Sequence, residues 1–307
     1  MLIIRDKSPL PPNLRGSAIA LGNFAGLHLG HQSVIQKTIE HARELGKPAA
    51  ILTFEPHPRR IFKPELPPLR IISFSEKIRI LKELGIDFMR VIRFTREFST
   101  TTAEAFIRNI LVGELGASHV VTGDDFVFGY KRTGNAEYLQ KMAHELDFGY
   151  TACPPLLVGG ERCSSTRVRE ALSQGNMALT EMLLGRPYNI TGIVREGDKR
   201  GRQLGFPTAN ILPGRIFTPA IGVYAIRAKV LRQQLNGVAN FGVRPTFNGA
   251  RLQLEVHLFD WNQDIYGEHM EVNFVEFIRP EKKFDGIEAL KKQIAEDSEK
   301  AKNLLSK

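Results

Sequence analysis

The residues best suited to chemistry stand in one stretch, GDKRGRQLGFPTAN, at positions 197–210. Glycines such as Gly205 let a backbone turn sharply and bring its N–H groups close to a ligand. Lys199 and Arg202 lie among these glycines and supply positive charge for phosphate oxygens. The chain has no GxxxxGK[ST] pattern, so this is not a Walker loop. The stretch is either a phosphate-binding loop or an ordinary basic loop that leads into a strand.

The end of the same stretch carries oxygen atoms that suit a metal ion. Pro207 fixes its own backbone φ angle. Thr208 and Asn210 then offer a hydroxyl oxygen and an amide oxygen one residue apart. Because Mg²⁺ prefers oxygen ligands and is usually shared with phosphates, these two residues are the candidate metal ligands.

A histidine motif, GNFAGLHLGH at residues 22–31, lies between a predicted strand and a predicted helix. The first N–H groups of a helix and its partial positive charge favour an anion in such a turn. His28 and His31 would donate hydrogen bonds to a phosphate as negative charge builds up in a transition state. The alternatives are half of a metal site or two surface histidines, and the strand–glycine–helix setting favours phosphate.

Two further segments carry polar groups with an ordinary explanation beside the functional one. In RCSSTRVREAL, residues 162–172, Ser165, Thr166 and Arg169 suit the β and γ phosphates of ATP, but Ser and Thr are also preferred at a helix start. In RLQLEVHLFD, residues 251–260, alternation predicts Leu252, Leu254, Val256 and Leu258 on one face and Gln253, Glu255, His257 and Phe259 on the other. From the pattern alone, Glu255 is a solvent-facing strand residue.

The first half of the chain alternates strands and helices. Strands are predicted at 17–24, 49–54, 88–94 and 118–123, with a further strand around 150–158, and helices at 34–45, 75–85 and 102–115. This alternation predicts an α/β domain with a parallel, doubly wound, Rossmann-like sheet. In such sheets ligands bind beyond the carboxyl ends of the strands. The histidine motif, TFEPHP (53–58) and GDDFVFGYKRTGN (123–135) all follow strands, and their aromatic residues suit a flat ring system or the core.

The second half changes character after a helix predicted at 176–185. Its strands are predicted at 189–194, 208–212, 222–230, 237–243, 252–260 and 271–278, with a terminal helix at 285–305. Short strands with frequent turns predict an all-β domain, a small antiparallel β-barrel on which the terminal helix packs. The pair Asn236–Gly237 is typical of a hairpin turn. We therefore expect two domains, residues 1–184 and 185–307.

Composition limits the classes of protein that remain. The 307 residues contain 42% hydrophobic residues, enough for a core in each domain, and the net charge of +9 fits nucleotides or nucleic acid. The two cysteines cannot form a disulfide framework or a four-cysteine zinc site. No signal peptide or membrane-spanning run is evident, so a cytoplasmic protein is expected. The basic residues are scattered without an aromatic stripe, which makes nucleic acid the less favoured partner.

The second half resembles the riboflavin kinase family. The resemblance rests on five segments in the family's order: the GDxxGRxLGFPTAN stretch, GVYA (222–225), GVANFGVRPTF (237–247), LEVHLFD (254–260) and RPEKKF (279–284). It implies that Glu255 is the catalytic base and that Mg²⁺ is held through Thr208 and Asn210. It also implies that the cationic loop, with Lys199, Arg202 and Gly205, binds the ATP phosphates.

The first half resembles the HxGH nucleotidyltransferase superfamily, and more closely the FMN adenylyltransferase half of bacterial bifunctional FAD synthetases. The usual motif there is GxFDGxHxGH, followed by ISSTxxR. The resemblance implies nucleotide or flavin contacts for Gly22, Asn23, Phe24, Gly30, His57, Asp125, Ser165, Thr166 and Arg169, and catalytic roles for His28 and His31. Two residues depart from the pattern: Ala25 replaces Asp, which questions the efficiency of adenylyl transfer, and Cys163 replaces Ile.

Together the resemblances imply a bifunctional enzyme that phosphorylates riboflavin to FMN and then joins FMN to AMP from ATP, giving FAD and pyrophosphate. The implied ligands are ATP, Mg²⁺, riboflavin and FMN, with no nucleic acid, membrane or obligate protein partner. Two rivals stay open. One is a riboflavin kinase whose first domain is impaired or regulatory because of Ala25, and the other is a basic nucleic-acid-binding protein.

Overall fold

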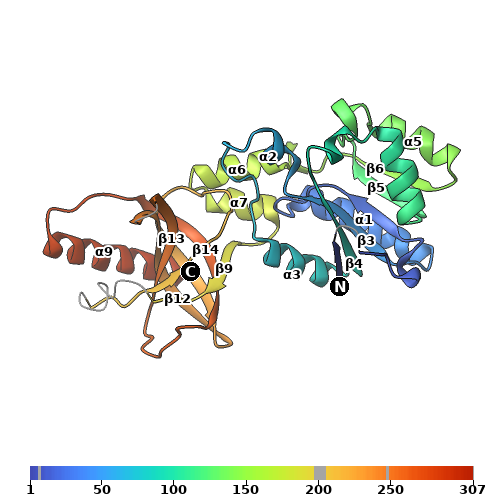
Figure 1. Ribbon diagram of the computed structural model, residues 1–307. Coiled ribbons are helices and arrows are strands. Elements are labelled where there is room, and N and C mark those ends of the chain that lie inside the picture. The colour runs from blue at the N-terminus through green and yellow to red at the C-terminus, as the bar shows by residue number, and fades with distance from the viewer. Residues whose placement is uncertain (6–7, 197–204, 247–248, 307) are drawn as a thin grey trace. The chain divides into compact units, whose positions relative to one another are not determined.

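The computed structural model describes residues 1–5, 8–196, 205–246 and 249–306 (Figure 1). The chain forms two compact units. The first contains residues 1–69 and 74–164, and the second contains 70–73 and 165–307. The functional boundary expected after residue 184 stays a prediction.

The first unit is built on a parallel sheet of six strands, drawn in blue to green in Figure 1. The strands are β1 (Leu2–Arg5), β2 (Ala18–Leu21), β3 (Ala49–Glu55), β4 (Phe88–Arg93), β5 (His119–Gly123) and β6 (Gly149–Cys153). All neighbouring pairs are parallel, and the order across the sheet is β1-β4-β3-β2-β5-β6. The predicted doubly wound α/β fold is confirmed.

Helices connect these strands because apolar residues recur at helical spacing between them. They are α1 (Leu29–Glu44), α2 (Pro58–Phe62), α3 (Phe74–Leu84), α4 (Ala103–Ala105), η3 (Phe106–Glu114) and α5 (Ala136–Glu145), with short 3₁₀ turns η1 (Pro12–Leu14), η2 (Phe98–Thr100) and η4 (Tyr130–Arg132). α1 buries Val34, Ile35 and Ile39 against the sheet. A two-stranded ribbon, β7 (Leu157–Val158) with β8 (Glu161–Arg162), ends the unit.

The helix predicted at 102–115 differs in its winding. Only Ala103–Ala105 is α-helical, and Phe106–Glu114 is a π-helix. The N–H of Leu115 accordingly bonds to the carbonyl of Ile110, five residues back, at 3.0 Å. Hydrophobic spacing over so short a segment does not separate a period of 3.6 residues from a slightly longer one, so the sequence predicted only that the segment is helical.

The order of the strands reverses at β2. The chain passes from β2 to β3 on one side, and β5 later joins β2 on the other side. Ligands bind at such a switch point, beyond the carboxyl ends of the strands. The histidine motif follows β2 directly and the GDDFVFG segment overlaps the end of β5 and continues beyond it, so both lie at this point.

The second unit begins with two helices and continues as an antiparallel sheet. Its elements are α6 (Ser165–Ser173), α7 (Met177–Leu184), β9 (Tyr188–Ile193), β10 (Ala209–Ile211), β11 (Gly222–Val230), β12 (Gln233–Thr246), β13 (Gly249–Leu258), β14 (His269–Pro280) and α9 (Ile287–Leu305). The six strands lie in the order β10-β13-β12-β11-β14-β9. A bridge between Arg195 and Asn210 links the two outer strands, so the curled sheet approaches the predicted barrel.

The predicted hairpin turn at Asn236–Gly237 is wrong. The turn between β11 and β12 is formed by Leu231 and Arg232, whose φ angles are 49° and 63°. Asn236 and Gly237 lie inside β12. Gly237 is required there because a Cβ atom would stand 2.5 Å from the carbonyl oxygen of His257 on the next strand. The glycine therefore permits close approach of two strands and does not supply a turn.

The terminal helix α9 packs on the sheet of the second unit, as predicted. Ala301 and Leu305 join a small core with Val223, Val238 and Phe259. Phe259 was expected to share an outer strand face, and the helix buries it there to 8% exposure.

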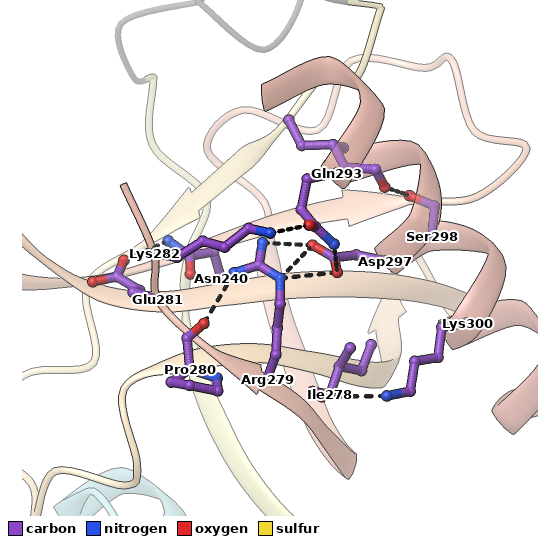
Figure 2. A network of polar contacts seen from close by, with 11 residues as sticks. Asn240, Ile278, Arg279, Pro280, Glu281, Lys282, Gln293, Asp297, Ser298 and Lys300 are labelled. Atoms are coloured by element: carbon purple, nitrogen blue, oxygen red, sulfur yellow. Dashed lines mark hydrogen bonds and ion pairs between the residues drawn. The ribbon is translucent and has the colours of Figure 1, made fainter. Parts of the chain in front are cut away.

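An ion pair anchors this helix (Figure 2). Arg279 meets the buried carboxylate of Asp297, with Nη2 to Oδ2 at 2.6 Å and Nε to Oδ1 at 3.0 Å. Gln293 donates to the same carboxylate at 3.0 Å, and Lys282 donates to Gln293. The RPEKKF segment thus has a structural part in the fold.

Candidate active sites

His28 caps the helix that follows it. It is the N-cap residue of α1, and its Nδ1 accepts the N–H of His31 at 3.3 Å. The rings of His28 and His31 stack with centroids 3.7 Å apart and planes 22° apart. Because Nδ1 accepts this hydrogen bond, the proton of neutral His28 lies on Nε2. The Nε2–H of His28 is therefore the group that would donate a hydrogen bond to a phosphate oxygen.

His31 is held in its neutral form. Its pKa lies well below the usual value because burial disfavours the charged ring, and nearby His28 and Lys77 lower it further. Its Nδ1 is buried and has no hydrogen-bond partner among the residues that the structure describes. Buried polar atoms without a protein partner are uncommon in folded proteins.

The turn before the helix has an unusual backbone. Phe24 and Leu27 have φ angles of 48° and 49°, in the left-handed region that side chains disfavour. Two hydrogen bonds hold the carbonyl of Asn23, one from Lys77 Nζ at 3.0 Å and one from Thr53 Oγ1 at 3.3 Å. The turn is thus fixed from the neighbouring strand and from α3.

Gly30 lets another segment reach the histidines. A Cβ atom on Gly30 would stand 3.1 Å from the carbonyl oxygen of Cys163, so only glycine allows this approach comfortably. Cys163 is buried, and its Sγ lies 3.7 Å from Nδ1 of His28. The residue that departs from the family motif therefore contacts a predicted catalytic residue.

His57 and Asp125 have local partners. Nδ1 of His57 accepts the N–H of Arg59 at 3.2 Å and caps α2. Asp125 is exposed and pairs with Nη2 of Arg162 at 2.9 Å. His57 follows β3 and Asp125 follows β5, and these two strands flank β2 in the sheet. The contact of both residues with substrate stays a prediction. Phe54 and Phe128, nearby aromatics, belong to the core.

The SSTxxR residues lie on α6, in the second compact unit. The helix begins at Ser165, so the prediction that this Ser and Thr segment starts a helix is confirmed. Nη2 of Arg169 lies 3.3 Å from Oγ1 of Thr166. Because these residues and the histidines belong to different units, their convergence on one triphosphate stays a prediction.

The second candidate site is a row of polar side chains across three strands. Register places Asn210 of β10 opposite Glu255 of β13, and Glu255 opposite Asn240 of β12. Residues directly opposite in an antiparallel sheet share a face. Gln253 donates to Oδ1 of Asn210 and lies 3.5 Å from Oε1 of Glu255. Leu254, Val256 and Leu258 are buried on the opposite face, as predicted, while Leu252 is half-buried.

A pocket of about 270 Å³ shares Asn210 with this row. Its walls come from two segments and one strand: Pro207–Asn210, Trp261–Tyr266, Val256 and Leu258. The indole N–H of Trp261 is buried without a hydrogen-bond partner in the described part of the chain. His257 fixes one wall, because its Nδ1 lies 2.9 Å from the carbonyl oxygen of Pro207. Aromatic walls with an unsatisfied donor suit a planar heterocycle.

The donors beside the pocket fit Mg²⁺ bound together with a nucleotide. Within the described ranges, no three His, Cys, Asp or Glu side chains form a metal site. Thr208 and Asn210 line the pocket and offer uncharged oxygens, with the Glu255 carboxylate next in register. Mg²⁺ commonly takes few protein ligands and completes its shell with phosphates and water. Lys199 and Arg202 lie outside the described residues, whereas Gly205 is exposed with a φ of 86°.

Three residues of these sites escaped the sequence reasoning: Lys77, Asn240 and Gln253. Lys77 follows an ordinary helical pattern that gives no sign of burial. Asn240 stood within GVANFGVRPTF, and only the strand register shows that it flanks Glu255. Gln253 was placed on the correct face without a role.

The fold and the two sites define a class: a nucleotide-dependent transferase with a switch-point histidine site and a separate site on a curled β-sheet. Residues 10–167 match the model of the FAD synthetase family, and residues 184–305 match that of the riboflavin kinase family. The chain belongs to the bifunctional riboflavin kinase/FMN adenylyltransferase family.

Curated relatives with that name match this chain over nearly their whole length. The chain is 43% identical to the Escherichia coli K12 protein over 92% of this chain and 90% of the relative. It is 43% identical to the Haemophilus influenzae protein over 98% of each, and 39% identical to the Bacillus subtilis protein over 93% and 91%. A crystal structure described as a macrolide-efflux protein from Streptococcus pneumoniae has a TM-score of 0.86 and 32% identity, over 99% of each chain. Among the described residues, no helix is long and apolar enough to span a membrane.

The predicted activities follow from both matches. The chain is a riboflavin kinase that makes FMN and an FMN adenylyltransferase that makes FAD, with ATP as the donor in both reactions. This favours the bifunctional reading over the rivals of an impaired first domain and a nucleic-acid-binding protein.

Proposed function

We propose that the two reactions use two separate sets of residues, the histidine motif for adenylyl transfer and the Glu255 row for phosphorylation. For adenylyl transfer, the FMN phosphate attacks the α-phosphorus of ATP directly and pyrophosphate leaves. His28, through Nε2, and neutral His31 donate hydrogen bonds to the charge that develops on the phosphate oxygens. The observation that supports this is the helix-capping geometry of His28, which leaves its proton on Nε2.

Other residues would bind the substrates of adenylyl transfer. Gly22, Asn23 and Phe24 belong to the segment between β2 and α1, and Gly30 to the first turn of α1, at the switch point where anions bind. Ser165, Thr166 and Arg169 would hold the β and γ phosphates. His57 and Asp125 would lie near FMN or the nucleotide. Ala25, which stands where the family motif has Asp, is buried to 7% exposure. In this proposal, adenylyl transfer proceeds with that small apolar side chain.

For phosphorylation, Glu255 accepts the proton of the ribityl 5′-hydroxyl as that oxygen attacks the γ-phosphorus of ATP. The supporting observation is its position between Asn210 and Asn240, because Asn210 also lines the pocket that would take the nucleotide. Thr208 and Asn210 would hold Mg²⁺, which neutralises phosphate charge. Lys199, Arg202 and Gly205 would cover the phosphates. Because phosphoryl transfer depends mainly on positioning and charge, these contacts matter as much as the base.

The proposed partners are the small molecules ATP, riboflavin and FMN, without nucleic acid or an obligate protein partner. A cytoplasmic location fits two reactions that each consume ATP. The scattered distribution of the charge of +9 supports small anionic ligands over a nucleic-acid surface.

Two variants test the separation of the sites. Glu255→Gln should lose FMN formation from riboflavin by at least about 100-fold and keep FAD formation from supplied FMN. His31→Asn should do the opposite. The activity that each variant keeps shows that the variant is folded. The products are separated by chromatography. Glu255→Gln that still makes FMN at the wild-type rate would remove Glu255 from the mechanism.

A further inference from the structure

Lys77 is a lysine buried in the interior of the first unit. It lies on α3 with 2% of its surface exposed. Burying an ammonium group is strongly unfavourable unless hydrogen bonds and opposite charge compensate for the lost water. A buried lysine beside a predicted active site therefore requires an explanation, and nothing above gives it a role in either reaction.

The ammonium group joins the ends of two neighbouring strands. Its Nζ donates to the carbonyl oxygen of Asn23, just after β2, at 3.0 Å. The same nitrogen lies 3.8 Å from Oε1 of Glu55, the last residue of β3. Because β2 and β3 are adjacent and parallel, both contacts lie at the carboxyl edge where ligands bind.

The carbonyl that Lys77 holds belongs to the turn that leads to the histidines. Phe24, the next residue, has the left-handed φ of 48°. For a residue with a side chain, this conformation is disfavoured and persists only when the surroundings impose it. Lys77 and Thr53, which both donate to the Asn23 carbonyl, hold the preceding peptide group in place.

Asn23, in the same turn, carries a buried polar side-chain atom. Oδ1 of Asn23 is buried and has no hydrogen-bond partner within the described ranges, and Nδ1 of His31 is in the same condition. Orphaned polar atoms are uncommon in folded proteins and cluster at functional sites. Lys77 thus supports a turn whose buried polar atoms lack protein partners within the described ranges, as is common at a functional site.

We propose that Lys77 is a positioning residue for adenylyl transfer, which holds the turn of the histidine motif through the Asn23 carbonyl and places a fixed positive charge beside it. The proposal rests on the proposed function of His28 and His31. The charge attracts the anionic FMN and ATP phosphates, and it opposes protonation of His31, whose pKa it helps to lower after burial and His28. The edge-on ring of Phe24, 5.2 Å away, completes the surroundings of His31.

Three variants separate positioning from plain stability. Lys77→Met removes the charge and the hydrogen bond, Lys77→Arg keeps a charge and donors, and Lys77→Met with Glu55→Gln removes both partners of the ion pair. The readouts are kcat and KM for FAD formation from FMN, the pKa of His31 by NMR, and FMN formation from riboflavin. This last reaction is assigned to the other site and serves as the internal control for an intact protein.

We expect Lys77→Met to lower kcat/KM for FAD formation about 10- to 100-fold, the effect of losing a hydrogen bond from a charged group. Riboflavin phosphorylation should stay within about two-fold. The pKa of His31 should rise, a shift that a purely structural role would not produce, and Lys77→Arg should keep the low pKa and most of the activity. The double variant should remain as impaired in FAD formation as Lys77→Met.

Three results would overturn the proposal. One is FAD formation within about two-fold of wild type in Lys77→Met. Another is full recovery in the double variant, because Lys77 would then only neutralise Glu55. The third is an unchanged pKa of His31 in a folded variant. If Lys77→Met fails to fold, the double variant and Lys77→Arg give the same decision. His31→Asn tests the proposed function separately: unchanged FAD formation there removes the histidine from the mechanism whatever Lys77 does.

Discussion

At the residue scale, the proposed adenylyl-transfer mechanism depends on which ring nitrogen of His28 carries the proton. Two groups lie against Nδ1, the N–H of His31 at 3.3 Å and the thiol of Cys163 at 3.7 Å. Both can donate, so both favour the form of the ring that carries its proton on Nε2. Sequence reasoning noted Cys163 only as a replacement of Ile, because the contact joins residues 135 positions apart in the sequence.

We expect Cys163→Ile to lower kcat for FAD formation about two- to five-fold, because a thiol is a weak donor and its loss costs less than an ordinary hydrogen bond. Cys163→Ser, which keeps a donor, should retain more activity than Cys163→Ile. Both rates are measured with supplied FMN, and riboflavin phosphorylation is the control. Equal activity in the Ile variant and the wild type would show that the thiol has no part in orienting His28.

At the element scale, a second histidine pair links α1 to the sheet away from the active site. His41 of α1 and His119 of β5 stack with centroids 3.8 Å apart. Both Nε2 atoms meet Oγ1 of Thr151, at 3.2 Å and 2.9 Å. Burial, with a contribution from His41, lowers the pKa of His119 from 6.5 to about 4, while Glu44 opposes and Lys37 supports that shift.

The lowered pKa predicts acid sensitivity. Below pH 6.5 the unfolded chain takes up a proton that folded His119 resists, so its contribution is intact above pH 6.5 and falls as the pH drops toward 4. After discounting for partial exposure to solvent, the loss is about 1–2 kcal/mol. His119→Gln should flatten the decrease in the free energy of unfolding between pH 7.5 and 4.5, measured with urea. An identical decrease in variant and wild type would refute this assignment.

The terminal helix provides a second prediction at this scale. Asp297→Ala leaves the Arg279 guanidinium without its carboxylate and should lower the free energy of unfolding by about 3 kcal/mol. It should also impair riboflavin phosphorylation more than FAD formation, because α9 covers the sheet face that carries Glu255. Glu299→Ala breaks the exposed pair with Lys302 on the same helix and should leave the free energy of unfolding nearly unchanged. Equal losses in the two variants would contradict an anchoring role for Arg279.

The same elements show what the sequence could and could not predict. The parallel sheet was predictable because buried strands and amphipathic helices alternate along the chain. The hairpin at Asn236–Gly237 was mispredicted because Gly237 serves strand contact, and Leu231–Arg232 make the turn although neither residue is typical of one. Lys77 looked like a surface position of an amphipathic helix, since burial of a charged residue depends on tertiary contacts that no local pattern contains.

At the scale of the whole molecule, two unrelated architectures on one chain serve consecutive reactions. The parallel sheet places its loops at a switch point, where helix starts and strand ends offer N–H groups to phosphates. The antiparallel sheet instead aligns side chains in rows across strands, which places a carboxylate between two amides. The product of the second architecture, FMN, is the substrate of the first.

The most direct test of this account is a mixing experiment with riboflavin, ATP and Mg²⁺, in which flavins are separated by chromatography over time. Glu255→Gln alone should leave riboflavin unchanged, and His31→Asn alone should stop at FMN. The two variants together should form FAD, because FMN released by one is adenylylated by the other, and the wild-type chain is the positive control. FAD formed from riboflavin by Glu255→Gln alone, or no FAD from the mixture, would contradict the assignment of one reaction to each site.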